Sequence, residues 1–189
     1  RILSDGSDIY NSHISTQFAG KPRYLMADEL PSTVTIRGIN YKTETCNRYS
    51  GILSMKESVS DSLTFSVDDA LSETFQLPST CLLTIGTGSG QAGYTTAVVK
   101  HDDTRLTCFD SHARNAEGLR CPNGKAVVME ANSVTDFASY LRKLARSIYG
   151  STFKPFEVVT ERIQRIDTAN LDSRSLPEAS SSSSTSTSP

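Results

Sequence analysis

The amino-acid sequence predicts one α+β domain followed by a polar tail. The length of 189 residues suits a single domain of ordinary size. Short apolar or β-branched runs, separated by turn residues, predict strands that are joined in hairpins. A stripe of apolar residues at helical spacing predicts a helix that can pack on those strands. This mixture of hairpins and helices is typical of the α+β class.

Three segments are predicted as helices. The first spans residues 4–14 and the second residues 67–76. Ser66 and Asp69 have the spacing of a capping box at the start of the second helix, and Pro78 ends it.

The third helix has the clearest pattern, because its apolar residues recur at spacings of 3, 4, 3 and 4. Ser133 is suited to cap its start, and Gly150 is suited to end it. The stripe consists of Val134, Phe137, Leu141, Leu144 and Ile148.

Six runs are predicted as strands, because apolar and β-branched residues fill them while Pro, Gly or polar residues bound most of them. They are residues 33–37, 81–85, 94–100, 105–109, 126–129 and 156–160. The polar residues 101–103 are predicted to form the turn of a hairpin.

Residues 1–165 are therefore predicted to form the domain, and residues 166–189 a disordered tail. From residue 179 onward the tail is almost entirely Ser and Thr, which cannot bury enough surface to offset the entropy of ordering. The chain begins with Arg1 rather than Met, so we expect the natural polypeptide to begin earlier.

The charge pattern argues against nucleic acid or an anionic membrane as a partner. Nineteen basic and 21 acidic residues give a net charge of −2, and no run of Lys and Arg exceeds two residues. No segment approaches the roughly 20 apolar residues of a membrane span, and the start lacks a secretory signal. We therefore expect an intracellular protein, in the cytoplasm or nucleus.

The cysteines are spaced too widely for a typical zinc site, and no cofactor or metal is predicted. In an intracellular chain, free thiols are expected rather than disulfides. The four cysteines are Cys46, Cys81, Cys108 and Cys121.

Asp110 and His112 form the most suggestive pair of polar residues. They lie one residue apart at the end of a predicted strand, so their side chains project from the same face and Ser111 points away. A carboxylate in this place can accept the Nδ1 proton of the imidazole and leave Nε2 free to act as a base. From the tripeptide alone, a local hydrogen bond at a polar strand end is the simpler interpretation.

No residue of the chain is a convincing nucleophile for this base. Cys108 shares the strand face of Asp110, but it lacks a helix N-terminus that would activate its thiol. The other three cysteines lie in strand-like or loop settings. Of the remaining histidines, His101 is predicted to lie in a surface turn, and nothing near His13 in the sequence would activate it.

A glycine-rich segment offers an alternative function. Residues 82–90 are similar to the first motif of S-adenosylmethionine-dependent methyltransferases, in which a strand, a glycine-rich turn and a helix follow one another. Here a β-branched run follows Tyr94, which disfavours a helix. A loop within a hairpin explains the glycines more simply.

The order of elements around Asp110 and His112 resembles a known family. The strand that ends in this pair, Arg114 after it, the loop 118–124, the next strand and the helix with Tyr140 carry the resemblance. Together they are similar to the papain-like deubiquitinases of herpesvirus large tegument proteins and their tegument-like relatives in animals. The resemblance covers roughly residues 2–160.

This resemblance implies a partial papain-like cysteine peptidase fold that lacks its N-terminal, Cys-bearing helix. It implies that His112 and Asp110 are catalytic and that ubiquitin or a ubiquitin-like modifier is the partner. From their position alone, we expect residues 114–124 to line a groove for the modifier's tail. The chain has no Gln-Cys pair of the kind the family uses. The nucleophile is therefore expected before Arg1, and this chain alone is expected to be inactive. A non-catalytic binding domain with the same fold is the alternative.

Overall fold

The computed structural model confirms an α+β fold. Its helices are α1 (Ile2–Gln17), α2 (Val67–Thr74) and α3 (Val134–Tyr149). The structure describes residues 2–17, 29–57, 63–76, 79–86 and 93–166.

Eight strands of the described residues form one sheet, in the order β1-β2-β8-β4-β5-β6-β7, with β3 beside β2. Neighbouring strands are antiparallel, except that β2 and β3 are parallel. The strands are β1 (Thr33–Ile36), β2 (Ile39–Ile52), β3 (Thr64–Phe65), β4 (Thr80–Ile85), β5 (Tyr94–Asp102), β6 (Arg105–Arg114), β7 (Lys125–Ala131) and β8 (Pro155–Ile166).

The core lies between one face of this sheet and the helices α2 and α3. Residues of β4, β5 and β6 alternate between buried and partly exposed, as expected for strands covered on one face. The apolar stripe of α3 packs on that face. The largest side chains of this core are Phe137, Phe156, Leu53, Leu71, Leu83, Ile85, Leu106, Leu141 and Leu144.

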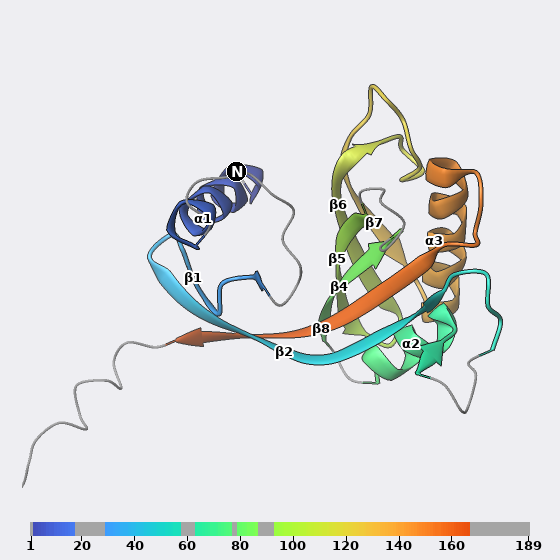
Figure 1. The fold of residues 1–189 in the computed structure, drawn as a ribbon, viewed down its shortest axis with the longest axis horizontal. Helices are drawn as coiled ribbons and strands as arrows, with labels where there is room; N and C mark the ends of the chain where they lie inside the picture. Colours follow the sequence, from blue (N-terminus) through green and yellow to red (C-terminus); the bar gives the residue numbers. More distant parts are fainter. Residues whose placement is uncertain (1, 18–28, 58–62, 77–78, 87–92, 167–189) are drawn as a thin grey trace, which may run out of the picture.

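A second region is built on the far ends of β2 and β8. These strands pair from Ile52 and Pro155 to Asn40 and Ile166, and Figure 1 shows that they extend as a ribbon from the main sheet to β1 and α1. A two-residue turn joins β1 to β2, and both of its residues, Arg37 and Gly38, have positive φ angles.

Both caps predicted for α3 are confirmed. The Ser133 hydroxyl accepts a hydrogen bond from the Asp136 amide at 3.0 Å, and Gly150 ends the helix with a φ of 71°. At α2, Ser66 likewise accepts from the Asp69 amide at 3.1 Å, but the helix ends at Thr74, two residues earlier than predicted.

The predicted strands are all present, but several are longer than the sequence indicated. β6 continues to Arg114 instead of ending at residue 109, and the turn before it lies after Asp102, so that His101 belongs to β5. The strands β2 and β3 were not predicted. The tail predicted for residues 166–189 lies outside the described residues from 167 onward.

The methyltransferase alternative is wrong, because the glycine-rich segment does not lead into a helix. β5 begins at Tyr94 and pairs antiparallel with β4, from Ile85↔Tyr94 to Thr80↔Val99. The cofactor motif requires a helix and then a parallel strand in this place. Part of the loop, residues 87–92, lies outside the described residues.

Candidate active site

The end of β6 departs from regular pairing where Asp110 and His112 lie. β6 pairs with β7 at Asp110↔Val127 and again at Arg114↔Lys125. Between these two pairs the chain advances by four residues on β6 but by only two on β7. The extra residues form a bulge, a feature that can redirect a side chain. The backbone N–H of His112 bonds to the Asp110 side chain instead of to a neighbouring strand.

Asp110 is fully buried and uses both of its carboxylate oxygens. Oδ1 accepts hydrogen bonds from the His112 amide at 2.9 Å and from His112 Nδ1 at 2.7 Å. Oδ2 accepts from Arg114 Nε at 2.7 Å. The contact predicted between Asp110 and His112 is therefore present.

The surroundings of Asp110 favour its charged form. Burial by itself raises the pKa of this carboxyl, but the hydrogen bonds from His112 and Arg114 and the positive charge of Arg114 lower it further than burial raises it. The net pKa of Asp110 lies below its usual value. A carboxylate can only accept, so Nδ1 of His112 carries the proton and Nε2 is the basic nitrogen.

The His112 ring is held on one side and open on another. Its side chain is 35% exposed, and the Tyr94 ring packs against it with 4.8 Å between ring centroids. Tyr94 in turn contacts Tyr149 of α3 edge to face at 5.9 Å. Within the described residues, no hydrogen bond occupies Nε2, so a reacting group can approach this atom.

The loop after β6 is fixed to α3. Tyr140 donates a hydrogen bond to the Gly118 carbonyl at 3.1 Å, and the Arg120 amide donates to the Ser147 hydroxyl at 3.2 Å. Gly118 has a φ of 75°, and a Cβ there would lie 2.8 Å from the Tyr140 hydroxyl. The loop therefore lies close against the helix beside the pair.

Arg114 does not fit the predicted groove, because it is buried. Its side chain instead completes a row of three polar residues on one strand face with Asp110 and His112. The sequence carried a signal for this role, since the three residues occupy positions i, i+2 and i+4. That residues 115–124 line the groove for the modifier's tail stays a prediction.

None of the cysteines is placed to act with His112. Cys81 and Cys108 are buried, and burial raises the pKa of the Cys108 thiol to about 12 and that of Cys81 further. Cys46 is exposed on β2, and Cys121 lies in the loop. All four thiols are free, and no hydrogen bond joins any of them to His112 in the described part of the chain.

The other histidines make contacts of their own. His13 Nε2 lies 2.7 Å from the Glu29 carbonyl oxygen, and His101 Nε2 lies 3.0 Å from the Thr107 hydroxyl. Among the described residues, no group of three or more His, Cys, Asp and Glu side chains is arranged to hold a metal ion. No helix in the described ranges is long and apolar enough to cross a membrane.

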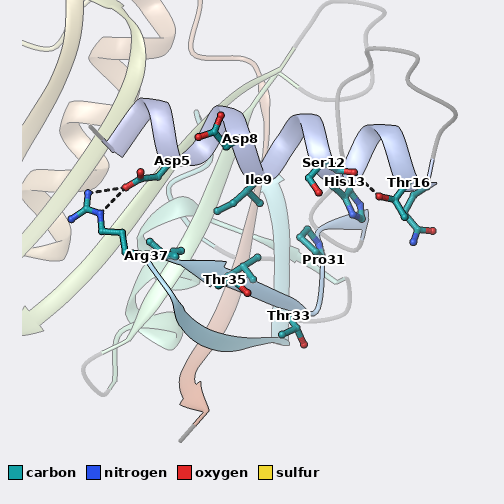
Figure 2. Close-up of a pocket in the computed structure, with 13 residues that line it drawn as sticks. Asp5, Asp8, Ile9, Ser12, His13, Thr16, Pro31, Thr33, Thr35 and Arg37 are labelled. Atoms are coloured by element: carbon teal, nitrogen blue, oxygen red, sulfur yellow. Dashed lines mark hydrogen bonds and ion pairs between the residues drawn. The ribbon is translucent and has the colours of Figure 1, made fainter. Parts of the chain in front are cut away.

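A separate groove of about 490 Å³ lies between α1 and the β1–β2 hairpin. Figure 2 shows Asp5 of α1 facing Arg37 of the hairpin turn across one end of it, with a 2.7 Å ion pair between them. Neither Asp110 nor His112 lines this groove.

Comparisons with known proteins agree with this fold. Residues 1–166 match the sequence model of a family described as the herpesvirus tegument protein, N-terminal conserved region. A similar solved structure is the ubiquitin-specific protease encoded by murine cytomegalovirus tegument protein M48, in complex with a ubiquitin-based suicide substrate. The TM-score is 0.66 at 15% identity, over 89% of this chain and 68% of that one. No curated protein gives a significant sequence match.

Proposed function

The chain belongs to the family of the herpesvirus tegument protein N-terminal conserved region, and on this premise we propose that it forms the acid–base half of a papain-like, thiol-dependent ubiquitin peptidase site. The observation that carries the proposal is the 2.7 Å contact between the buried carboxylate of Asp110 and Nδ1 of the half-exposed His112. The family resemblance deduced from the sequence is confirmed.

In the proposed reaction, His112 moves protons and Asp110 orients it. Nε2 takes the proton of a cysteine thiol, and the thiolate attacks the carbonyl carbon of the bond that follows the ubiquitin C-terminus. The carbon–nitrogen bond breaks, and His112 gives its proton to the departing lysine amine. Water then hydrolyses the thioester, with His112 again acting as the base. Asp110 holds the tautomer and stabilises the imidazolium that forms in each step.

The nucleophile of this reaction is proposed to come from sequence that precedes Arg1. The buried thiols of Cys81 and Cys108 have raised pKa values, which leaves them protonated at neutral pH. Cys46 and Cys121 have no contact with His112 among the described residues. We therefore expect this chain by itself to hydrolyse nothing.

Ubiquitin or a related modifier is the proposed partner. The similar viral protease was solved with a ubiquitin-based substrate, and its fold matches most of this chain. The loop from Asn115 to Gly124 is the proposed wall of the groove for the modifier's tail. The amide of Cys121 in this loop donates to the carbonyl of Ala113, the residue after His112, and the loop is fixed to α3. A fixed wall lets the scissile bond be held close to Nε2.

A ubiquitin derivative with a C-terminal electrophile tests the proposal. We expect a covalent adduct with a longer polypeptide that includes the sequence before Arg1, and none with the present chain. The adduct should be lost in His112→Ala and kept in the control His101→Ala, which changes an exposed histidine on β5. A folded longer polypeptide that forms no adduct contradicts the proposal.

The second candidate is a binding domain of the same fold that does not catalyse. It is favoured by the observation that none of the four cysteines, all of which lie in the described part of the chain, is placed to act with His112. Ubiquitin binding by the longer polypeptide, measured by calorimetry, without any adduct would support this candidate in place of the peptidase.

A further inference from the structure

Arg114 is the least exposed cation beside the proposed site. Only 1% of its side chain is exposed, and its Nε donates to Asp110 Oδ2 at 2.7 Å. Its Nη1 donates weakly to the Ala113 carbonyl at 3.4 Å, and its Cζ lies 5.2 Å from the centre of the Tyr94 ring. Nη2 is buried and has no hydrogen-bond partner within the described residues.

A buried guanidinium must be balanced by an anion, because Arg does not lose its proton in proteins. Asp110 is the anion in contact with it. The two oxygens of Asp110 have separate partners, since Oδ1 faces His112 and Oδ2 faces Arg114. The contact at Oδ2 therefore fixes the rotation of the carboxylate and with it the direction of Oδ1.

We propose that Arg114 is a positioning residue that also sets the basicity of His112. It holds the Asp110 carboxylate with Oδ1 toward Nδ1, and its positive charge limits how strongly that carboxylate favours the imidazolium form. The consequence for catalysis rests on the function proposed above. The effect on the titration of His112 does not, because it follows from the charges in this chain.

The other titratable groups around the pair do not supply a compensating charge at neutral pH. Burial raises the pKa of the Tyr140 and Tyr149 hydroxyls and of the Cys108 thiol, so these groups stay neutral there. The neighbouring cations make contacts elsewhere. Lys154 lies over the Tyr149 ring, and Arg120 donates to the Ile148 carbonyl. The titratable groups that face the pair from other elements are Tyr94 of β5 and Tyr140 and Tyr149 of α3, and Cys108 lies beside the pair on β6 itself.

The test is an NMR titration of the imidazole rings in the present chain. In Arg114→Met the carboxylate is no longer balanced, so we expect the midpoint of His112 to rise by about one pH unit. In Arg114→Lys, which keeps the charge, we expect most of this shift to disappear. His101 serves as the internal control, because it lies on another strand and its midpoint should not move.

A loss of folding in Arg114→Met does not end the test, because a second pair of variants measures the same charge. The double variant Asp110→Asn/Arg114→Met removes both charges and so leaves no buried ion unpaired. Compared with it, Asp110→Asn alone keeps the Arg114 charge, and its His112 midpoint should be lower by about one pH unit.

Two results would overturn the proposal. One is an equal His112 midpoint in folded Asp110→Asn and in the double variant. The other is an equal rise in Arg114→Lys and Arg114→Met, which would show that charge is not the cause. These results are independent of the adduct experiment, so the failure of one inference can be told from the failure of the other.

Discussion

Two ion pairs in this chain have the same length but lie in different surroundings. Arg114 and Asp110 on β6 are 2.7 Å apart, and so are Arg37 and Asp5, which join the hairpin turn to α1. The side chains of the first pair are 1% and 0% exposed, and those of the second are 50% and 30% exposed. Arg37 even makes two hydrogen bonds to its partner, where Arg114 makes one.

Burial, and not contact geometry, therefore decides what each pair does. Around β6 the two charges are removed from water, so each depends on its partner. Removing either one leaves the other buried without a counter-charge, which lowers the stability of the fold. At the hairpin, water and salt screen both charges, and each can be solvated alone. The same contact fixes the carboxylate of the candidate site in one region and contributes little to the stability of the other.

Asp110→Ala should cause the largest loss of stability, because it leaves Arg114 buried without an anion. We expect the free energy of unfolding to fall by about 3–5 kcal/mol, measured by urea denaturation. The matched control is Asp5→Ala at the exposed pair, for which we expect at most about 1 kcal/mol. Equal losses in the two variants would remove the distinction between the regions.

The Asp110 carboxylate should also make the stability of the folded chain depend on pH in the acidic range. The pKa of Asp110 is lower in the folded chain than its usual value. The ionised carboxylate therefore stabilises the fold fully above about pH 3.9, the usual pKa of Asp. This stabilisation is lost as the pH falls through the lower pKa that Asp110 has in the folded chain. The stability difference between the natural chain and Asp110→Asn should therefore be large at pH 7 and shrink below about pH 4. A difference that stays constant with pH would contradict this.

Leu106→Ala separates packing from charge on the same strand. Leu106 is buried in the core on the strand face of Asp110, and its truncation should cost about 3 kcal/mol through lost burial and a cavity. The His112 titration should stay unchanged in this variant, unlike in Arg114→Met. A shifted His112 midpoint would show that the site depends on packing in general.

Gly118→Ala should weaken the attachment of the loop to α3 by about 1–3 kcal/mol. The added Cβ would lie 2.8 Å from the Tyr140 hydroxyl and 2.9 Å from Met129 Sδ, and the positive φ disfavours Ala. Thermal unfolding measures the loss. Gly6→Ala in α1 is the control, because a Cβ there meets nothing within 4 Å and Ala favours a helix. A smaller loss in Gly118→Ala than in Gly6→Ala would contradict the tight contact.

The sequence predicted best those elements whose signals are local. The caps at Ser133 and Gly150 and the apolar stripe between them lie within one segment, so the helix could be placed from the chain alone. The strand β2 could not be placed in this way, because Ile39–Ile52 is mostly polar and contains no buried residue. Its pairing with β8 also joins residues more than 100 positions apart. Its stability comes from partners that a local pattern does not reveal.

The candidate site shows the same division. The contact between Asp110 and His112 followed from alternation on a strand, although the structure adds a bulge that the spacing did not indicate. Arg114 was assigned to a groove from its position after the pair, although its spacing from Asp110 also fitted the same strand face. Only the structure, in which this strand end is buried, shows that the charge of Arg114 pairs with Asp110.

The exposed pair allows the smallest and most selective test. Arg37 has a φ of 52°, a conformation in which Asn is favoured over other non-glycine residues. Arg37→Asn therefore removes the ion pair with Asp5 but relieves the backbone of the turn. Because a screened pair contributes at most about 1 kcal/mol, the two effects should nearly cancel, leaving the unfolding free energy within about 0.5 kcal/mol of its original value. A loss of several kcal/mol in urea denaturation would mean that this pair, despite its exposure, holds its region as firmly as Arg114 holds Asp110.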